Sequence, residues 1–212
     1  MIHSPRSGKF ITLEGVDGAG KSTHVAWIAQ CLERTGKQVL LTREPGGTPV
    51  GEKLRGLTLH ESMGIDAETL LMFAARREHL EQVIWPALER GSWVLCDRFT
   101  DATYAYQGAG RGLPMDRIRI LEEWVHPEFV PDLTFVFHVS IEVAEARRNS
   151  RSTDGGDRFE HLDRAFFHRV AEAYRQRAMD DPARMKLIDA SRSISEIQNE
   201  LEICIATYCK QI

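Results

Sequence analysis

The chain has 212 residues, of which 42% are hydrophobic and 27% are charged, and its formal net charge is −4. This length fits one domain with a core of its own, here residues 1–212, and the composition is ordinary for a soluble globular protein. A small negative net charge gives no general attraction to nucleic acid or to a membrane surface, so neither is expected as a partner.

The cysteines and the N-terminal segment indicate where the protein works. Before Glu14 the chain has only a brief apolar run, which is too short for a signal peptide or a membrane span. The cysteines show no C-x-x-C spacing, so they are expected to be reduced thiols rather than disulfides or zinc ligands. They are Cys31, Cys96, Cys204 and Cys209. The cytoplasm is therefore the expected location.

Short apolar runs that are typical of strands alternate with longer helical patterns. This alternation predicts an α/β fold in which helices cover both faces of a parallel sheet. The expected strands are Phe10–Glu14, Gln38–Thr42, Trp93–Asp97, Leu133–Val139 and Met185–Ile188. The expected helices are Ser22–Thr35, Asp66–Arg90 with a potential kink at Pro86, Ile141–Asn149, Leu162–Met179 and Ile194–Cys209. The small, polar stretch Ser150–Gly156 is expected to be mobile.

A phosphate-binding loop is predicted between the first strand and the first helix. The segment GVDGAGKST matches G-x-x-x-x-G-K-[ST] in the context that this motif requires, although a glycine-rich turn alone would also fit. Its backbone N–H groups and the helix N-terminus attract phosphate, Lys21 reaches the β- and γ-phosphates, and the Ser22 hydroxyl ligates Mg²⁺. The expected ATP site is Gly15, Val16, Asp17, Gly18, Ala19, Gly20, Lys21, Ser22 and Thr23.

The loop by itself does not identify the reaction, because GTPases and motor ATPases share it. The N-K-x-D segment with which a GTPase reads guanine is absent from the sequence. Two other segments follow predicted strands at the edge where α/β proteins bind ligands. Arg43 could hold a phosphate, or its segment could be a plain turn. Asp97 could hold Mg²⁺ and Arg98 an acceptor phosphate, or the two could form a structural ion pair.

Two further groups of side chains could recognise a nucleotide. Phe73 and Arg76 lie three residues apart on one helical face, which suits a stacked base with a hydrogen-bonded carbonyl, but an aromatic residue in such a stripe can equally be core. Thr103, Tyr106 and Gln107 carry hydroxyl and amide groups suited to a base edge or a sugar. A surface turn is the alternative for that segment.

In combination, these segments resemble the thymidylate kinase family, the ATP:dTMP phosphotransferases among the P-loop nucleoside monophosphate kinases. TREPGG and D-R-x₇-Y-Q-G form a specific pair, and the matching segments follow in order over most of the chain. They are EGVDGAGKST (14–23), TREPGGT (42–48), LMFAARREHL (71–80), CDRFTDATYAYQGAGRG (96–112), VPDLT (130–134) and DRFE (157–160).

The resemblance implies a three-layer P-loop fold with a five-stranded parallel sheet, a mobile lid at about 147–160 and, usually, a homodimer. It implies Mg²⁺-dependent transfer of the ATP γ-phosphoryl group to dTMP, which makes dTDP and ADP for dTTP synthesis. By the same resemblance, Asp17 bonds the sugar 3′-hydroxyl, Arg98 and Arg43 clamp the dTMP phosphate, and Tyr106 excludes a ribose 2′-hydroxyl.

The resemblance also assigns the base pocket and the lid. Thymine would be lined by Arg55 and Arg76, bonded by Thr103 and Gln107, and covered by Phe73, although the family position of the aromatic falls on Met72. Some relatives carry a basic residue in the P-loop and others carry arginines in the lid. Gly18 places this chain with the lid-arginine bacterial form. The candidate catalytic arginines there are Arg147, Arg151 and Arg158.

Three other functions remain to be weighed. One is a kinase for a different base, against which Arg76 and Gln107 favour thymine. Another is a nucleotide-binding regulatory protein without turnover. The presence of every charged residue expected of an active enzyme disfavours it: Asp17, Lys21, Arg98 and Arg151. A nucleic-acid motor fits poorly, because 212 residues leave no room for a second motor domain.

Overall fold

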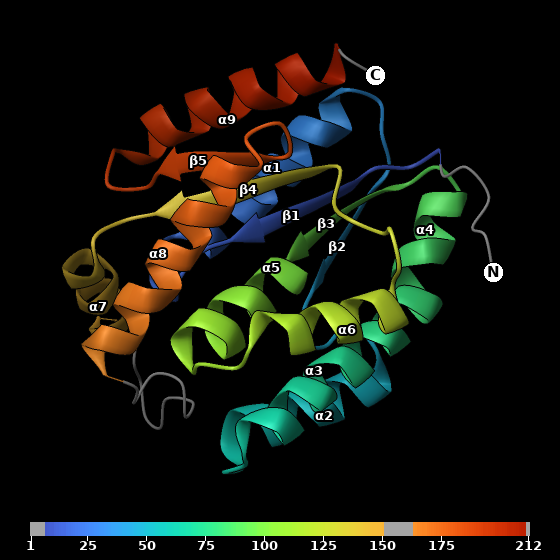
Figure 1. Ribbon diagram of the computed structural model, residues 1–212. Coiled ribbons are helices and arrows are strands. Elements are labelled where there is room, and N and C mark those ends of the chain that lie inside the picture. Colours follow the sequence, from blue (N-terminus) through green and yellow to red (C-terminus); the bar gives the residue numbers. More distant parts are fainter. Residues whose placement is uncertain (1–6, 151–162, 211–212) are drawn as a thin grey trace.

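The framework is a five-stranded sheet in the order β2-β3-β1-β4-β5, with every pair parallel. The computed structural model describes residues 7–150 and 163–210 (Figure 1). The strands are β1 (Phe10–Glu14), β2 (Val39–Arg43), β3 (Trp93–Asp97), β4 (Leu133–His138) and β5 (Met185–Asp189). All five strands predicted from the sequence are confirmed, with ends that differ by at most one residue.

Both faces of the sheet are covered because successive side chains of a strand point in opposite directions. All five residues of β1 are buried. Ile11 and Leu13 enter one hydrophobic cluster, which includes residues of helices on that face, while Phe10 enters a second cluster. The near-continuous apolar character of the central strands therefore follows from their having no solvent-facing side.

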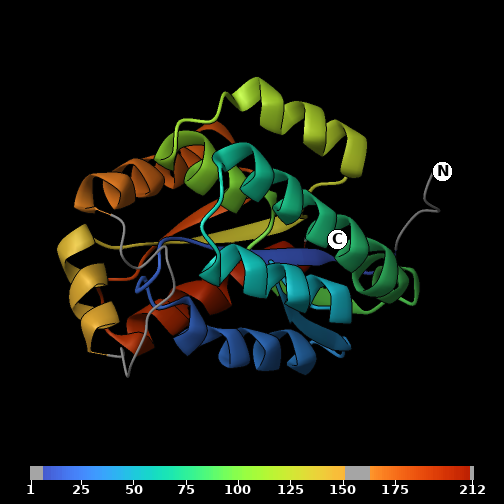
Figure 2. The same cartoon turned by 90° about the horizontal axis from the view of Figure 1, so that it is seen from below.

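Helices form the two outer layers (Figures 1 and 2). On one face, α1 (Lys21–Arg34) packs against α9 (Ile194–Cys209). On the other face, α4 (Trp85–Glu89) contacts β3, and α8 (Arg164–Asp180) contacts β4 and β5. Outside this layer, α3 (Ile65–His79) packs against both α2 (Pro49–His60) and α6 (Met115–Val125). The helix α7 (Ile141–Asn149) follows β4 and contacts α8.

The long helical stretch predicted at 66–90 is present but divided. It runs from α3 through a π-helical turn, η1 (Leu80–Ile84), into α4, where Pro86 stands in the first turn. Proline has no N–H to donate, so Pro86 interrupts the helical hydrogen-bond pattern where the π-helical turn ends.

The sequence analysis missed several helices after the second and third strands. They are α2, α6, the short α5 (Thr100–Thr103) and the π-helical η2 (Tyr104–Gly110). The glycine-rich end of this last segment favours a turn in the sequence, yet it is helical. A Cβ on Gly110 would lie 2.5 Å from Phe166 Cε2, and one on Gly108 would lie 2.7 Å from Met115 Sδ. These glycines therefore let η2 approach α8 and α6 closely.

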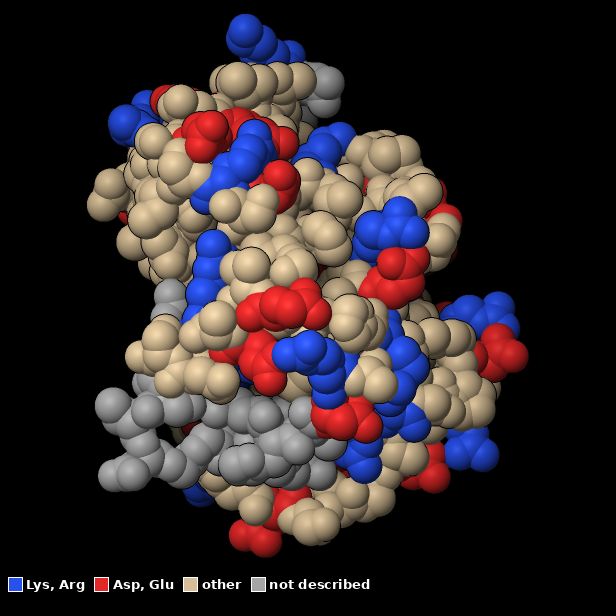
Figure 3. Space-filling model, turned by 90° about the vertical axis from the view of Figure 1, so that its left-hand side faces the viewer, with Lys and Arg blue, Asp and Glu red and all other residues tan. Residues whose placement is uncertain are grey.

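No helix in residues 7–150 or 163–210 is both long and apolar enough to cross a membrane. On the face shown in Figure 3, basic and acidic side chains lie beside one another in small groups, without a broad patch of one sign.

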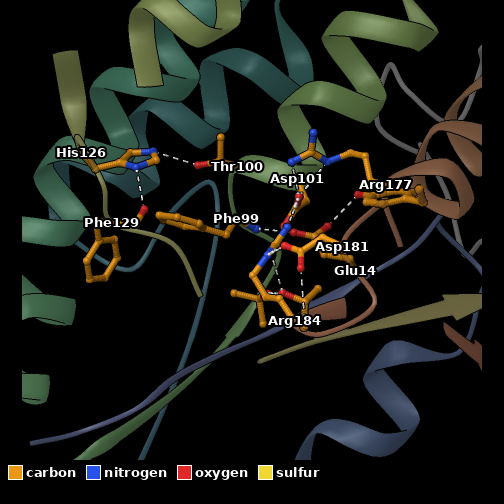
Figure 4. Close-up of polar contacts among 12 residues, drawn as sticks. Glu14, Phe99, Thr100, Asp101, His126, Phe129, Arg177, Asp181 and Arg184 are labelled. Atoms are coloured by element: carbon orange, nitrogen blue, oxygen red, sulfur yellow. Dashed lines mark hydrogen bonds and ion pairs between the residues drawn. The ribbon is translucent and has the colours of Figure 1, made fainter. Parts of the chain in front are cut away.

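The segment after α6 is tied to the start of α5 by a buried histidine. The side chain of His126 is 1% exposed, and its Nε2 lies 2.9 Å from Thr100 Oγ1 while its Nδ1 lies 3.0 Å from the Phe129 carbonyl oxygen (Figure 4). Since a carbonyl oxygen only accepts, Nδ1 carries the proton and Nε2 accepts from Thr100. Burial, aided by the charge of Arg76, lowers the pKa of His126 to about 4.

This pKa predicts an acid-sensitive fold. The ordinary pKa of histidine is about 6.5. Between about pH 6.5 and 4, residue 126 is therefore protonated in the unfolded chain and neutral in the folded chain. The free energy of unfolding should therefore fall as the pH falls through this range. His126→Gln should show a smaller fall between pH 7.5 and 5 in urea titrations. The exposed His60→Gln serves as the control, and equal pH slopes for His126→Gln and wild type would contradict the assignment.

Candidate active site

The loop between β1 and α1 is shaped to receive an anion. Gly15, Gly18 and Gly20 have φ angles of 132°, 85° and 102°, which L side chains rarely adopt. A Cβ on Gly15 would also lie 2.4 Å from the Phe137 carbonyl oxygen. Gly20, the N-cap of α1, offers no side-chain cap, and the first turn of α1 has no acidic residue, so the helix itself does not compensate its positive end.

Lys21 is folded back onto this loop. Its side chain is largely buried, and Nζ donates to the Gly15 carbonyl oxygen at 3.0 Å. Burial and the nearby charge of Arg98 lower the pKa of Lys21, while the charges of Asp97 and Asp17 oppose this. The lysine is therefore held close to acidic groups and to the mouth of the loop.

Asp97 ends β3 beside the loop. In the part of the chain that the structure describes, its buried Oδ1 has no hydrogen-bond partner. A buried carboxylate oxygen without a partner is costly, so such an atom is typical of a site for a cation or a ligand.

Arg98 follows Asp97 directly, and its backbone angle and hydrogen bonds fix its side chain firmly. Its φ of 72° is unusual for a residue with a side chain. Its Nη1 donates to the Gly15 carbonyl oxygen at 2.9 Å and to the Tyr174 hydroxyl at 3.1 Å. Its Nη2 donates to Asp17 Oδ1 at 2.6 Å and to the Tyr106 hydroxyl at 3.0 Å. Arg98 therefore joins the loop to residues of two helical segments.

The carboxylate of Asp17 is stabilised in its charged form. Burial raises its pKa, but the charges of Arg98 and Lys21 outweigh this and hold the pKa well below its usual range. Tyr106 also donates its hydroxyl to Asp17 Oδ2 at 2.9 Å, and Arg98 lies over its ring at 4.8 Å. These contacts fix the Tyr106 ring beside the loop.

Glu14, which the sequence analysis did not single out, holds Arg98 in place through the residues that Arg98 contacts. Its fully buried carboxylate accepts the Phe99 N–H at 2.7 Å and the Tyr174 hydroxyl at 2.7 Å. Burial and the charge of Asp101 raise the pKa of Glu14 to about 7. Glu14 thus holds the backbone after Arg98 and, through Tyr174, the guanidinium itself. Its place at the carboxyl end of the first strand was the only signal in the sequence.

A buried ion-pair network anchors the segment after Arg98 (Figure 4). Asp101 is 2% exposed and accepts from Arg177 Nε at 2.7 Å and from Arg184 Nη1 at 2.8 Å. Arg184 in turn pairs with Asp181 at 2.8 Å. The network joins α5 to α8 and to the start of β5, so it fixes the helical segment that carries Tyr106.

This network predicts a large stability cost for removing its centre. Asp101→Ala leaves Arg177 and Arg184 without their shared partner, and breaking a buried ion pair from one side costs about 3 kcal/mol or more. We expect a fall of this size in the free energy of unfolding, measured by urea denaturation. Asp116→Ala breaks the exposed pair with Arg119 and should cost well under about 1 kcal/mol. Equal effects of the two substitutions would contradict the assignment.

A cavity opens between the loop, the end of β2 and helices α2, α3, α5 and η2. It brings together most of the residues expected to hold the acceptor. Its lining is Asp17, Glu44, Pro45, Arg55, Leu59, Met72, Arg76, Arg98, Phe99, Ala102, Thr103, Tyr106 and Gln107. Arg55 donates to the Pro45 carbonyl oxygen at 3.0 Å, next to the Glu44–Pro45 cis peptide bond.

Two residues expected in the acceptor site are placed elsewhere. Arg43 does not line the cavity and pairs instead with Glu52 at 3.0 Å. Phe73 is 2% exposed in the core, where its ring stacks with His126, and Met72 lines the cavity in its place. The two neighbours project on different sides of α3, and only the side of Met72 faces the cavity.

Two arginines of α7 reach the phosphate-binding loop. Arg147 donates to the Ala19 and Ala190 carbonyl oxygens at 3.4 and 3.0 Å. Arg148, which the sequence analysis did not select, donates to the Asp17 carbonyl oxygen at 2.9 Å. Arg151, Arg158 and most of the expected lid lie outside the described residues.

A phosphate-binding loop and a polar cavity meet at one edge of a parallel sheet, with arginines between them, and this arrangement defines a P-loop nucleotide phosphotransferase. The family model described as thymidylate kinase matches residues 13–201. The thymidylate kinase of Bordetella petrii is 58% identical, with 92% of this chain and 93% of that one covered. That of Cupriavidus metallidurans is 56% identical, with 94% and 98% covered. The chain belongs to the thymidylate kinase family, as the sequence predicts.

A solved structure agrees with this assignment. The crystal structure of thymidylate kinase from Ehrlichia chaffeensis superimposes with a TM-score of 0.75 at 32% identity, covering 94% of this chain and 98% of that one. The α/β fold with its five-stranded parallel sheet, as the sequence predicts, therefore matches a solved thymidylate kinase structure at 32% identity.

Proposed function

We propose that this protein transfers the γ-phosphoryl group of ATP to the phosphate of dTMP, which yields dTDP and ADP. Family membership supports the reaction, and one observation carries its geometry. Arg98 contacts the Gly15 carbonyl oxygen of the phosphate-binding loop and Asp17 and Tyr106 of the cavity. The donor and acceptor sites therefore share one cation.

The loop and Lys21 would bind the phosphates of ATP at residues 15–23. Lys21 would exchange the Gly15 carbonyl oxygen for phosphate oxygens, a stronger, charge-assisted partner. Arg147 is close enough to the loop to add positive charge on the same side. In-line transfer needs mainly positioning and neutralised charge, which these groups supply.

Arg98 would clamp the acceptor phosphate, and Asp17 would accept a hydrogen bond from the sugar 3′-hydroxyl. An acceptor phosphate oxygen is already anionic near neutral pH, since the second pKa of a phosphomonoester is about 6. No general base is therefore required. Tyr106, fixed by Asp17 and Arg98, would leave no room for a 2′-hydroxyl.

The residues also fit Mg²⁺. Magnesium is usually held by one or two protein oxygens together with phosphates and water. Asp97 offers a buried carboxylate oxygen without a partner in the described chain, and Ser22 offers a hydroxyl at the start of α1. When bound there, Mg²⁺ would neutralise charge on the β- and γ-phosphates.

A coupled assay of ADP release tests the reaction. With ATP and Mg²⁺, dTMP should be strongly preferred over dGMP, AMP and the ribose form of TMP. Equal use of the two sugars would contradict the role of Tyr106. ADP release without dependence on an acceptor would show an ATPase and overturn the proposal.

In the same assay, Lys21→Ala and Arg98→Ala should each lower turnover by about 10²-fold or more, because each removes charge stabilisation from the transferring group. Both variants should remain folded by circular dichroism. Arg119→Ala, an exposed arginine on α6, is the matched control. Near-normal turnover of either site variant would contradict its placement.

We further propose that the protein is a homodimer in the cytoplasm. Large apolar side chains are exposed on α3 and α6, which pack against each other: Leu70 is 53%, Ile120 63% and Trp124 77% exposed. Exposed apolar groups of this kind are typical of interfaces. All four cysteines are free, as in proteins of reducing compartments.

Sedimentation equilibrium tests the dimer. The wild type should sediment at twice the mass of the chain, and Trp124→Glu should shift it towards monomer by placing a charge in the apolar contact. Introducing the same charge at the exposed, uncharged Asn199 of α9 (Asn199→Glu) should leave the mass unchanged. A monomeric wild type would exclude the proposal.

A further inference from the structure

Gln107 and Arg76, which line the part of the cavity expected to hold the nucleobase, are each hydrogen-bonded to a buried carboxylate. Gln107, which is 3% exposed, donates its Nε2 to Glu68 Oε1 at 2.7 Å. Glu68 is fully buried on α3 and also pairs with Arg111. Arg76 donates its Nε to Glu44 Oε2 at 2.8 Å. Glu44 lines the cavity and Glu68 does not, and the two carboxylates determine which atoms of Arg76 and Gln107 are left for a ligand.

The carboxylate of Glu68 fixes the orientation of the Gln107 amide. A carboxylate accepts hydrogen bonds and has none to donate, so the amide nitrogen must face it. In the opposite orientation, the Gln107 amide oxygen would face the Glu68 carboxylate oxygen. Both are acceptors, so the buried hydrogen bond between the two residues would be lost. The remaining amide atom, Oε1, has no hydrogen bond to any described residue. Gln107 therefore presents an acceptor to the cavity.

Arg76 presents the complementary donor. Its Nη2 donates to Thr103 Oγ1 at 3.1 Å, and its buried Nη1 has no partner in the described part of the chain. A guanidinium can only donate. Arg76 and Gln107 thus supply one donor and one acceptor, and each side chain is held in place by a hydrogen bond to a carboxylate.

This pattern distinguishes two classes of pyrimidine. A 4-oxo pyrimidine carries an acceptor at its C4 oxygen and a donor at N3–H, which match Arg76 Nη1 and Gln107 Oε1. A 4-amino pyrimidine carries the reverse pair, a donor at the C4 amino group and an acceptor at N3. Bound in the same way, it would set donor against donor and acceptor against acceptor.

We propose that Glu68 is a positioning residue that makes the cavity selective for 4-oxo over 4-amino pyrimidine monophosphates, by holding the Gln107 amide in one orientation. The proposal rests on the proposed function for its reaction, but it concerns the ratio between two acceptors. Glu68 does not line the cavity, so it acts only through Gln107.

The test is the ratio of kcat/KM for dTMP to that for dCMP, measured with the full chain. In Glu68→Gln, residue 68 can also donate, so the Gln107 amide is free to turn. We expect the ratio to fall by about tenfold or more, because a mismatched buried hydrogen bond then becomes a matched one. A role in stability alone would lower both values by the same factor and leave the ratio unchanged.

Two further variants separate charge from orientation. Arg111→Gln removes the ion pair but leaves Glu68 as an acceptor, so it should keep the wild-type ratio. The double variant Glu68→Gln, Gln107→Glu exchanges the two groups. Its carboxylate at position 107 would accept from the amide at 68 with one oxygen and offer the other to the cavity. It should recover most of the preference for dTMP.

The outcomes are distinct. An unchanged ratio in Glu68→Gln, or a ratio lost equally in Arg111→Gln, would overturn the proposal. If circular dichroism shows that Glu68→Gln is unfolded, the double variant decides: a ratio near that of wild type supports the proposal and a lost ratio overturns it. Failure of the wild type to use any pyrimidine monophosphate would instead refute the proposed function.

Discussion

The hydrogen bond from the Phe99 N–H to the carboxylate of Glu14 is the contact on which the rest of the site depends. At 2.7 Å it fixes the backbone immediately after Arg98, whose φ of 72° a residue with a side chain seldom adopts. The same carboxylate holds Tyr174, and Tyr174 holds the guanidinium. One acidic group at the end of the central strand therefore determines where the loop and the cavity meet.

The same arrangement recurs around the cavity. Glu44 holds Arg76, Glu68 holds Gln107 and Asp101 holds the segment that carries Tyr106. Burying charged groups is expensive, and a buried pair contributes little net stability compared with apolar packing. What these pairs provide is orientation, because a guanidinium or an amide that is bonded on one side has few positions left for the other. Removing one member of such a contact is nevertheless costly, because the other charge is left buried without its partner.

The sequence predicts the features of this protein that depend on residues close together in the chain. The phosphate-binding loop is readable because its glycines, lysine and helix start are adjacent, and the strands because their apolar runs are continuous. The role of Glu14 depends on Phe99 and Tyr174, which are distant in the chain. The placement of Phe73 depends on which side of α3 faces the cavity, and helical spacing alone does not contain that information. Gly108 and Gly110 are ambiguous in the same way, since glycine serves both turns and close packing.

Lys21 and Arg98 donate to the same atom, the carbonyl oxygen of Gly15, at 3.0 and 2.9 Å. Two positive charges thus share one acceptor, and their mutual repulsion weakens the hydrogen bond that each makes to it. Under the proposed function, a phosphate that draws Lys21 away would lower the repulsion between the cations and leave the oxygen to Arg98 alone. Under this function, occupation of the loop would therefore change how Arg98 is held, through a single backbone oxygen.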